Sequence, residues 1–177
     1  GSTADGCAAH TYPTLRMAAK GGRSIYMPKD TREPGEILAH ITSARVALTS
    51  AIFGLSEERL IIPGAAGKWS VKDLMAHIGH WEQVGLEELQ IHLRGERSGK
   101  DYRDAVALND EWEAGLQSLS LQESIQLFEA PHYQLFGLLA ALPAERWNGY
   151  VRAWVQGATW HHFEEHAEQI RAWRQSL

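Results

Sequence analysis

Residues 67–81, GKWSVKDLMAHIGHW, carry the strongest fold signal in the chain. Ser70 and Asp73 stand in the pattern of a capping box, in which the serine hydroxyl accepts from the backbone N–H three residues on and the carboxylate lies at the positive end of the helix. Apolar residues then recur at helical spacing up to about Arg94, where a glycine follows as a stop signal. This stretch predicts a long amphipathic helix whose inner face carries His77.

Four further segments show helical periodicity, and no segment alternates as a strand would. A second capping box begins at Ser120, and Pro131 predicts a kink or a late restart in the helix that it opens. Residues 144–157 are predicted to be a loop. The five predicted helices cover residues 33–55, 70–94, 102–119, 120–142 and 159–175. This pattern favours an all-α fold, an antiparallel four-helix bundle with an additional short helix and long connections.

The length of 177 residues predicts about one domain. Residues 1–30 show no helical or alternating period, so we predict a disordered or loosely packed tail followed by a bundle domain over residues 31–177. The first two residues, glycine and serine, resemble the remnant of a cleaved tag, and Met27 resembles a natural start. The single cysteine, Cys7, lies in this tail and has no partner for an internal disulfide.

The charge balance of 17 Lys+Arg against 22 Asp+Glu gives a net charge of −5. We therefore expect no nucleic-acid partner, because the chain has no excess of cations for a phosphate backbone. The longest uninterrupted apolar run, residues 135–144, is shorter than the roughly 18–20 residues that span a bilayer. These features predict no membrane association and a cytoplasmic location.

The placement of the nine histidines is the main indication of chemistry. His162 and His166 are four residues apart on the last predicted helix, so both imidazoles lie on one face and can hold one cation. His77, from a facing helix, would complete a three-histidine site with an open position, as in catalytic metal sites. Three neutral nitrogens suit Zn²⁺, Ni²⁺ or Fe²⁺. The residues leave open the alternative that these are hydrogen-bonded core histidines.

Three other side chains are candidate proton-transfer groups: Glu82, His80 and Tyr133. His80 is three residues from His77, so it either flanks the same site or faces a neighbouring helix. Glu82 either orients an imidazole through a hydrogen bond or is a solvated carboxylate. Tyr133 is expected at the mouth of the bundle. Trp69, which directly precedes the first capping box, is interpreted as a hydrophobic staple.

Two of these stretches resemble signatures of the DinB/YfiT-like superfamily. Within residues 67–82, the Gly-x-Trp-Ser-Val-x-Asp entry followed by a histidine is similar to the second-helix signature. Residues 160–173, with their His-x-x-x-His, resemble the last-helix signature, and residues 108–111 are similar to the middle of the ClbS/DfsB branch. The resemblance covers residues 28–177.

The resemblance implies an antiparallel four-helix bundle, homodimeric in many members, with His77, His162 and His166 as metal ligands. Branches of the superfamily include mycothiol-dependent maleylpyruvate isomerase, S-transferases that use bacillithiol or a similar thiol, and ClbS-like proteins that neutralise a reactive electrophile. The implied cofactor is a divalent metal, zinc or nickel, with a low-molecular-weight thiol as cosubstrate.

We therefore expect a DinB-like metal-binding protein. The favoured hypothesis is a metal-dependent enzyme, a thiol-dependent transferase, isomerase or hydrolase, which acts on a small electrophilic molecule through the three-histidine site. The alternative is a non-catalytic bundle that binds or sequesters a small molecule, or a stress-related dimer, with a structural metal or none.

Overall fold

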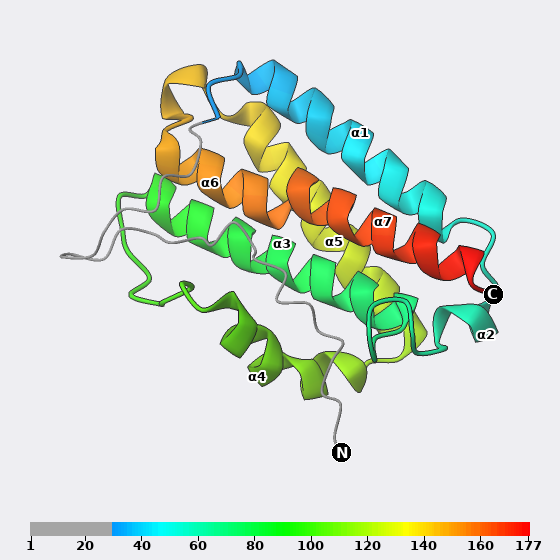
Figure 1. The fold of residues 1–177 in the computed structure, drawn as a ribbon. Helices are drawn as coiled ribbons and strands as arrows, with labels where there is room; N and C mark the ends of the chain where they lie inside the picture. The colour runs from blue at the N-terminus through cyan, green and yellow to red at the C-terminus, as the bar shows by residue number, and fades with distance from the viewer. Residues whose placement is uncertain (1–29) are drawn as a thin grey trace.

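The computed structural model describes residues 30–177. The predictions made for residues 1–29, including the tag remnant, Met27 and Cys7, lie outside the described residues. The helices are α1 (Pro34–Ile52), α2 (Glu57–Leu60), α3 (Val71–Leu93), α4 (Ala105–Gln117), α5 (Leu121–Ala141), the short 3-10 turn η1 (Ala144–Arg146), α6 (Gly149–Ala158) and α7 (Trp160–Gln175) (Figure 1). No strand occurs between residues 30 and 177, which confirms the all-α prediction.

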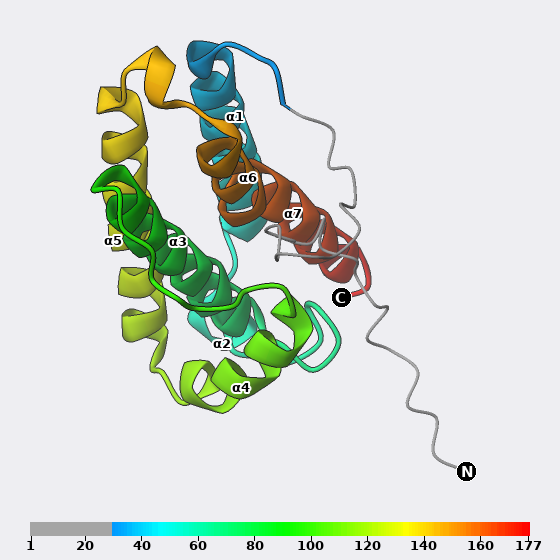
Figure 2. The ribbon, with the colours of Figure 1, turned by 90° about the vertical axis from the view of Figure 1, so that its left-hand side faces the viewer.

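Four long helices form the bundle, and the tightest pairs are α3 with α5 and α1 with α7 (Figure 1 and Figure 2). Helices α1 and α7 run in one direction and α3 and α5 in the other, which confirms the predicted antiparallel bundle. The helices of each tight pair are parallel to one another. For α3 and α5 this arrangement is possible because α4 carries the chain back to the end of the bundle where α3 begins. Helix α6 precedes α7 and also packs on α3.

Both predicted capping boxes are present. Ser70 Oγ accepts from Asp73 N at 3.2 Å, and Asp73 Oδ2 accepts from Ser70 N at 2.9 Å. The same reciprocal pair joins Ser120 and Glu123 at 3.2 and 2.8 Å. Such a cap stabilises a helix by about 1 kcal/mol, so local sequence sets where α3 and α5 begin.

The loop predicted over residues 144–157 is wrong, because α6 occupies most of it. Asn148 caps this helix by accepting from the backbone N–H three residues on at 3.1 Å. The buried face of α6 includes Val151, Trp154 and Val155. Two glycines lower the intrinsic helix propensity of this segment, whereas burial of its apolar face supplies the missing stability.

Helix α5 does not restart at Pro131 but continues through it. A proline has no N–H, so Pro131 leaves the carbonyl of Leu127 without its helical donor. That carbonyl lies against Gly79 of α3, where a Cβ would stand 2.0 Å from the Leu127 oxygen. Gly79 therefore allows the backbones of α3 and α5 to approach closely.

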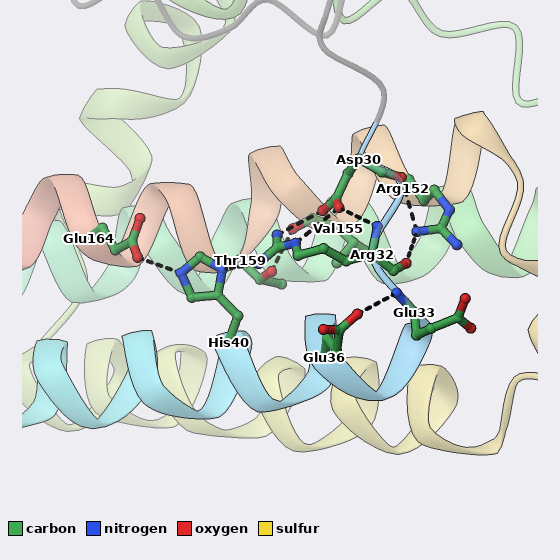
Figure 3. Close-up of polar contacts among 9 residues, drawn as sticks. All are labelled: Asp30, Arg32, Glu33, Glu36, His40, Arg152, Val155, Thr159 and Glu164. Atoms are coloured by element: carbon green, nitrogen blue, oxygen red, sulfur yellow. Dashed lines mark hydrogen bonds and ion pairs between the residues drawn. The ribbon is translucent and has the colours of Figure 1, made fainter.

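The N-terminal end of α1 is tied to α6 and α7 by polar contacts (Figure 3). Arg152 donates to the backbone oxygens of Asp30 and Arg32 at 3.1 and 2.7 Å. The ring of His40 lies between Arg32 and Glu164, with nitrogens 2.7 and 2.6 Å from the guanidinium and the carboxylate. These contacts set the register of α1 against the first turns of α7.

Candidate metal centre

Three histidines meet between α3 and α7. The Nε2 atoms of His77 and His162 are 2.9 Å apart. The ring centroid of His166 lies 5.3 Å from that of His77 and 4.6 Å from that of His162. The three side chains are 1%, 1% and 4% exposed. One nitrogen from each ring can be chosen so that all lie within 4.8 Å of one another.

A helix break at Thr159 precedes the two histidines of α7. Thr159, with φ −123° and ψ −107°, separates α6 from α7, and its Oγ1 donates to the Val155 oxygen at 2.5 Å. Helix α7 therefore starts anew, and the four-residue spacing places His162 and His166 on its face toward α3. The structure thus brings the three predicted ligands together, although His77 and His162 are 85 residues apart in the sequence.

The surroundings keep the imidazoles of His77 and His162 neutral. Burial lowers the pKa of His77 and of His162 well below the ordinary value, and the neighbouring imidazoles lower it further. His166 Nδ1 lies 2.8 Å from Gln169 Oε1. Because the amide oxygen accepts from Nδ1–H, Nε2 of His166 keeps its lone pair. Neutral imidazole is the form that binds a transition metal.

The donor set fits a divalent metal ion. A tetrahedral zinc ion with bonds of about 2.0–2.1 Å keeps its ligand nitrogens about 3.3 Å apart. The 2.9 Å between His77 Nε2 and His162 Nε2 is a hydrogen-bond distance and is also close to this separation, while all three donor atoms lie within 4.8 Å of one another. Within residues 30–177, no other group of three or more histidine, cysteine or carboxylate side chains brings its donor atoms close enough together to hold a metal ion. Three protein ligands are typical of catalytic zinc sites, whereas structural sites have four.

Glu82 is part of a separate buried network that joins α3 to α1 and α5. Its Oε1 lies 2.7 Å from His132 Nδ1, and its Oε2 lies 3.5 Å from Arg45 Nη1. The side chain is fully buried, so the alternative of a solvated carboxylate is wrong. Burial raises the pKa of Glu82, although its contacts with His132 and Arg45 act in the opposite direction.

His80 and Tyr133 also lie outside the three-histidine group. The ring of His80 faces α4, with its centroid 4.3 Å from that of Trp112. Of the two predicted positions, His80 therefore has the one that faces a neighbouring helix. Tyr133 is 70% exposed on α5, beside His132. The proton-transfer roles of these two residues and of Glu82 stay predictions.

Sequence reasoning missed two side chains that touch the histidines. Gln169 follows His166 by three residues on one helix, a spacing that could have indicated the contact. Trp69 was interpreted as a staple, yet its ring lies 4.7 Å from that of His77 in an edge arrangement. No local pattern signals the second contact, because Trp69 lies outside the helix that carries His77.

Acid is expected to destabilise the protein in the presence of a chelator. The folded-state pKa values of His77 and His162 are lowered, so below about pH 6.5 the unfolded chain binds protons that the folded chain does not. The contribution of these rings is fully present above that pH and is lost as the pH falls. Urea unfolding between about pH 7.5 and 5.5 should show a slope of up to about 1.4 kcal/mol per pH unit for each ring.

The matched variant for this prediction is His162→Phe. It removes one buried titrating ring and should flatten the pH dependence. Equal slopes in the parent chain and His162→Phe would show that His162 does not titrate differently in the two states.

Comparison with known proteins places the chain in a family. The family model described as the DinB superfamily matches residues 40–170, which include all three histidines. The chain belongs to the DinB superfamily. This result confirms the resemblance found in the stretches around His77 and His162. No curated protein sequence matches this DinB-superfamily chain.

Across residues 30–177, no helix combines the length and the apolar character needed to cross a bilayer.

Three solved structures share the fold of this DinB-superfamily protein. The colibactin self-resistance protein ClbS, crystallised with double-stranded DNA, has a TM-score of 0.69 and 12% identity, covering 86% of this chain and 99% of ClbS. DfsB, a sibling lethal factor precursor, has a TM-score of 0.69 and 17% identity, covering 83% and 98%. An uncharacterised protein from Escherichia coli UTI89 has a TM-score of 0.67 and 14% identity, covering 86% and 97%. The predicted likeness to the ClbS/DfsB branch is confirmed.

The expectation that nucleic acid is excluded as a partner is wrong. ClbS, which has the same fold, is seen in complex with double-stranded DNA. The exclusion rested on the net charge of −5. Net charge sums over the whole surface, whereas a phosphate backbone contacts only the face that it meets, so a negative total does not exclude such a partner.

Proposed function

We propose that this protein is a metal-dependent enzyme that directs a low-molecular-weight thiol, or water, at a small electrophilic molecule. The observation that carries the proposal is the convergence of three buried imidazoles from two helices to within 4.8 Å. His77, His162 and His166 would hold a divalent ion, zinc or nickel. We also propose that the protein is a homodimer and that it is cytoplasmic.

A divalent cation held by these histidines would supply Lewis-acid activation of a thiol or a water molecule. The protein contributes the environment. Burial keeps His77 and His162 deprotonated at neutral pH, so protons do not compete for their nitrogens. Gln169 holds the tautomer of His166 in which Nε2 is the donor atom. A site with three protein ligands has a position for a reactant, which favours catalysis over a purely structural ion.

The test has two stages. Elemental analysis of the purified protein, with and without prior incubation with zinc or nickel, should show one metal ion per chain. The loaded protein is then mixed with 1-chloro-2,4-dinitrobenzene and either cysteine or glutathione, and absorbance is followed. In this reaction the thiolate sulfur forms a bond to the ring carbon, chloride leaves, and the thiol proton goes to the buffer.

We expect faster thioether formation with the loaded protein than with chelator-treated protein. Metal binding without turnover across the thiols would favour the alternative, a non-catalytic bundle that sequesters a small molecule. A chain that takes up no metal would overturn the proposed function altogether.

A further inference from the structure

Helix α4 contributes none of the three histidines, yet one of its carboxylates reaches the segment that precedes α3. Glu113 Oε1 accepts from the indole nitrogen of Trp69 at 2.5 Å. Its other oxygen accepts from Lys68 Nζ at 2.8 Å. Glu113 thus holds the side chains of two consecutive residues that are 44 and 45 positions away in the sequence.

The ring that Glu113 holds is the one that packs on His77. The centroids of Trp69 and His77 are 4.7 Å apart, with an angle of 65° between the rings. The backbone of Trp69 is fixed as well, because its N–H donates to the Ala66 oxygen at 3.0 Å and its oxygen accepts from Gly64 N at 3.1 Å. Because hydrogen bonds fix both the backbone and the indole nitrogen, the Trp69 ring is a rigid packing surface for the imidazole of His77.

Helix α4 is itself anchored beside the Trp69 ring. Lys72 donates to the backbone oxygens of Gln117 and Leu119, each at 2.9 Å, at the C-terminal end of the helix. Trp69, His77, Glu113 and Gln117 line one narrow crevice that leaves no room for a water molecule. The carboxylate and the histidine thus border the same crevice, with the indole between them in the chain of contacts.

The carboxylate of Glu113 is ionised at neutral pH. Burial raises its pKa, but the hydrogen bonds from Lys68 and Trp69 outweigh that effect and leave the pKa below the ordinary value. A hydrogen bond from the indole N–H to a carboxylate is charge-assisted and about twice as strong as a neutral one. Glu113 therefore restrains Trp69 more firmly than a neutral acceptor would.

We propose that Glu113 is a positioning residue for the metal centre, which holds His77 in its ligand orientation by fixing the ring of Trp69. This inference rests on the metal site of the proposed function. Residues that orient a metal ligand affect affinity because an unrestrained ligand must be ordered when the ion binds. Glu113 acts through Trp69 and need not contact the metal or the substrate.

The test compares zinc affinity, measured by competition with a chromogenic chelator, in Glu113→Ala, Trp69→Phe and the double variant. Glu113→Ala should weaken binding about tenfold. Trp69→Phe retains an aromatic ring but lacks the N–H, so it should weaken binding to a similar degree. The double variant should be no weaker than either single variant, because both changes break the same contact.

Two further variants separate positioning from charge and folding. Glu111→Gln removes one negative charge from an exposed position on the same helix and should bind zinc as the parent chain does. Glu113→Gln keeps an oxygen that can accept from the indole and should restore part of the affinity. The visible spectrum of the Co²⁺-loaded protein should change in Glu113→Ala and stay unchanged in Glu111→Gln, while circular dichroism checks that each variant is folded.

Zinc affinity and Co²⁺ spectra in folded Glu113→Ala that match those of the parent would overturn the inference. Additive losses in the double variant would overturn it as well, since they would show that Glu113 acts by another route. Both outcomes differ from a failure of the proposed function, in which the parent chain itself binds no zinc.

Discussion

Alanine in place of His162 is expected to abolish stoichiometric zinc binding. The Nε2 of His162 lies 2.9 Å from that of His77, and no other histidine, cysteine or carboxylate donor of residues 30–177 converges on this group. Loss of one of three ligands should cost more than the roughly 100-fold in affinity that loss of an outer contact can cost. His77→Ala and His166→Ala should have the same effect, measured by elemental analysis and chelator competition.

His161→Ala is the matched control for this prediction. His161 is adjacent in sequence but is only half-buried, and its ring contacts Trp160 rather than the three histidines. The control should retain one zinc ion per chain. Retention of stoichiometric zinc in all three ligand variants would show that the metal is held elsewhere in the protein.

Gly79→Ala is expected to destabilise the fold strongly. A methyl group at this position would stand 2.0 Å from the Leu127 oxygen and 2.8 Å from the Phe128 nitrogen, and both are backbone atoms of α5. Neither can move without separating α3 from α5, the most extensive helix pair of the bundle. We expect a loss of about 3 kcal/mol or more in the free energy of unfolding, measured by urea denaturation, because severe overpacking exceeds the usual 1–3 kcal/mol.

Gly137→Ala provides the comparison within α5. Nothing lies within 4 Å of a Cβ at Gly137, so alanine there should be neutral or should stabilise the helix by roughly 0.5–1 kcal/mol. A Gly79→Ala protein as stable as the parent would show that α3 and α5 do not approach as closely as the structure indicates.

The elements of the fold were predictable where the signal is local. Capping boxes at Ser70 and Ser120 involve residues three positions apart, and each marks the start of a helix in the structure. Helix α6 escaped prediction because its stability depends on packing rather than propensity. Its residue Trp154 is fully buried and lies beside Gly85 of α3, a contact across the bundle that periodicity does not show.

The candidate site, like the fold, has features that follow from local sequence and others that depend on contacts between separate helices. His162 and His166 share a helix face by their spacing alone. The inner-face position of His77 on another helix made it a candidate partner, and the resemblance to a family implied the same three ligands. The prediction for Glu82 could not be refined from sequence, because Arg45 and His132 lie 37 and 50 residues away on other helices. The exclusion of nucleic acid failed for a related reason, since a net charge carries no information about where charges lie on the surface.

The sequence by itself determined the helices with strong caps, the bundle class and the pair of histidines on α7. These features depend on interactions within one or two turns, whose geometry the helix imposes. Only the tertiary structure decided the parallel packing of α3 on α5 at Gly79, the convergence of His77 with the α7 pair, and the contact of Glu113 with Trp69. Each of these joins residues on separate elements, so it exists only once the whole bundle has set their relative positions.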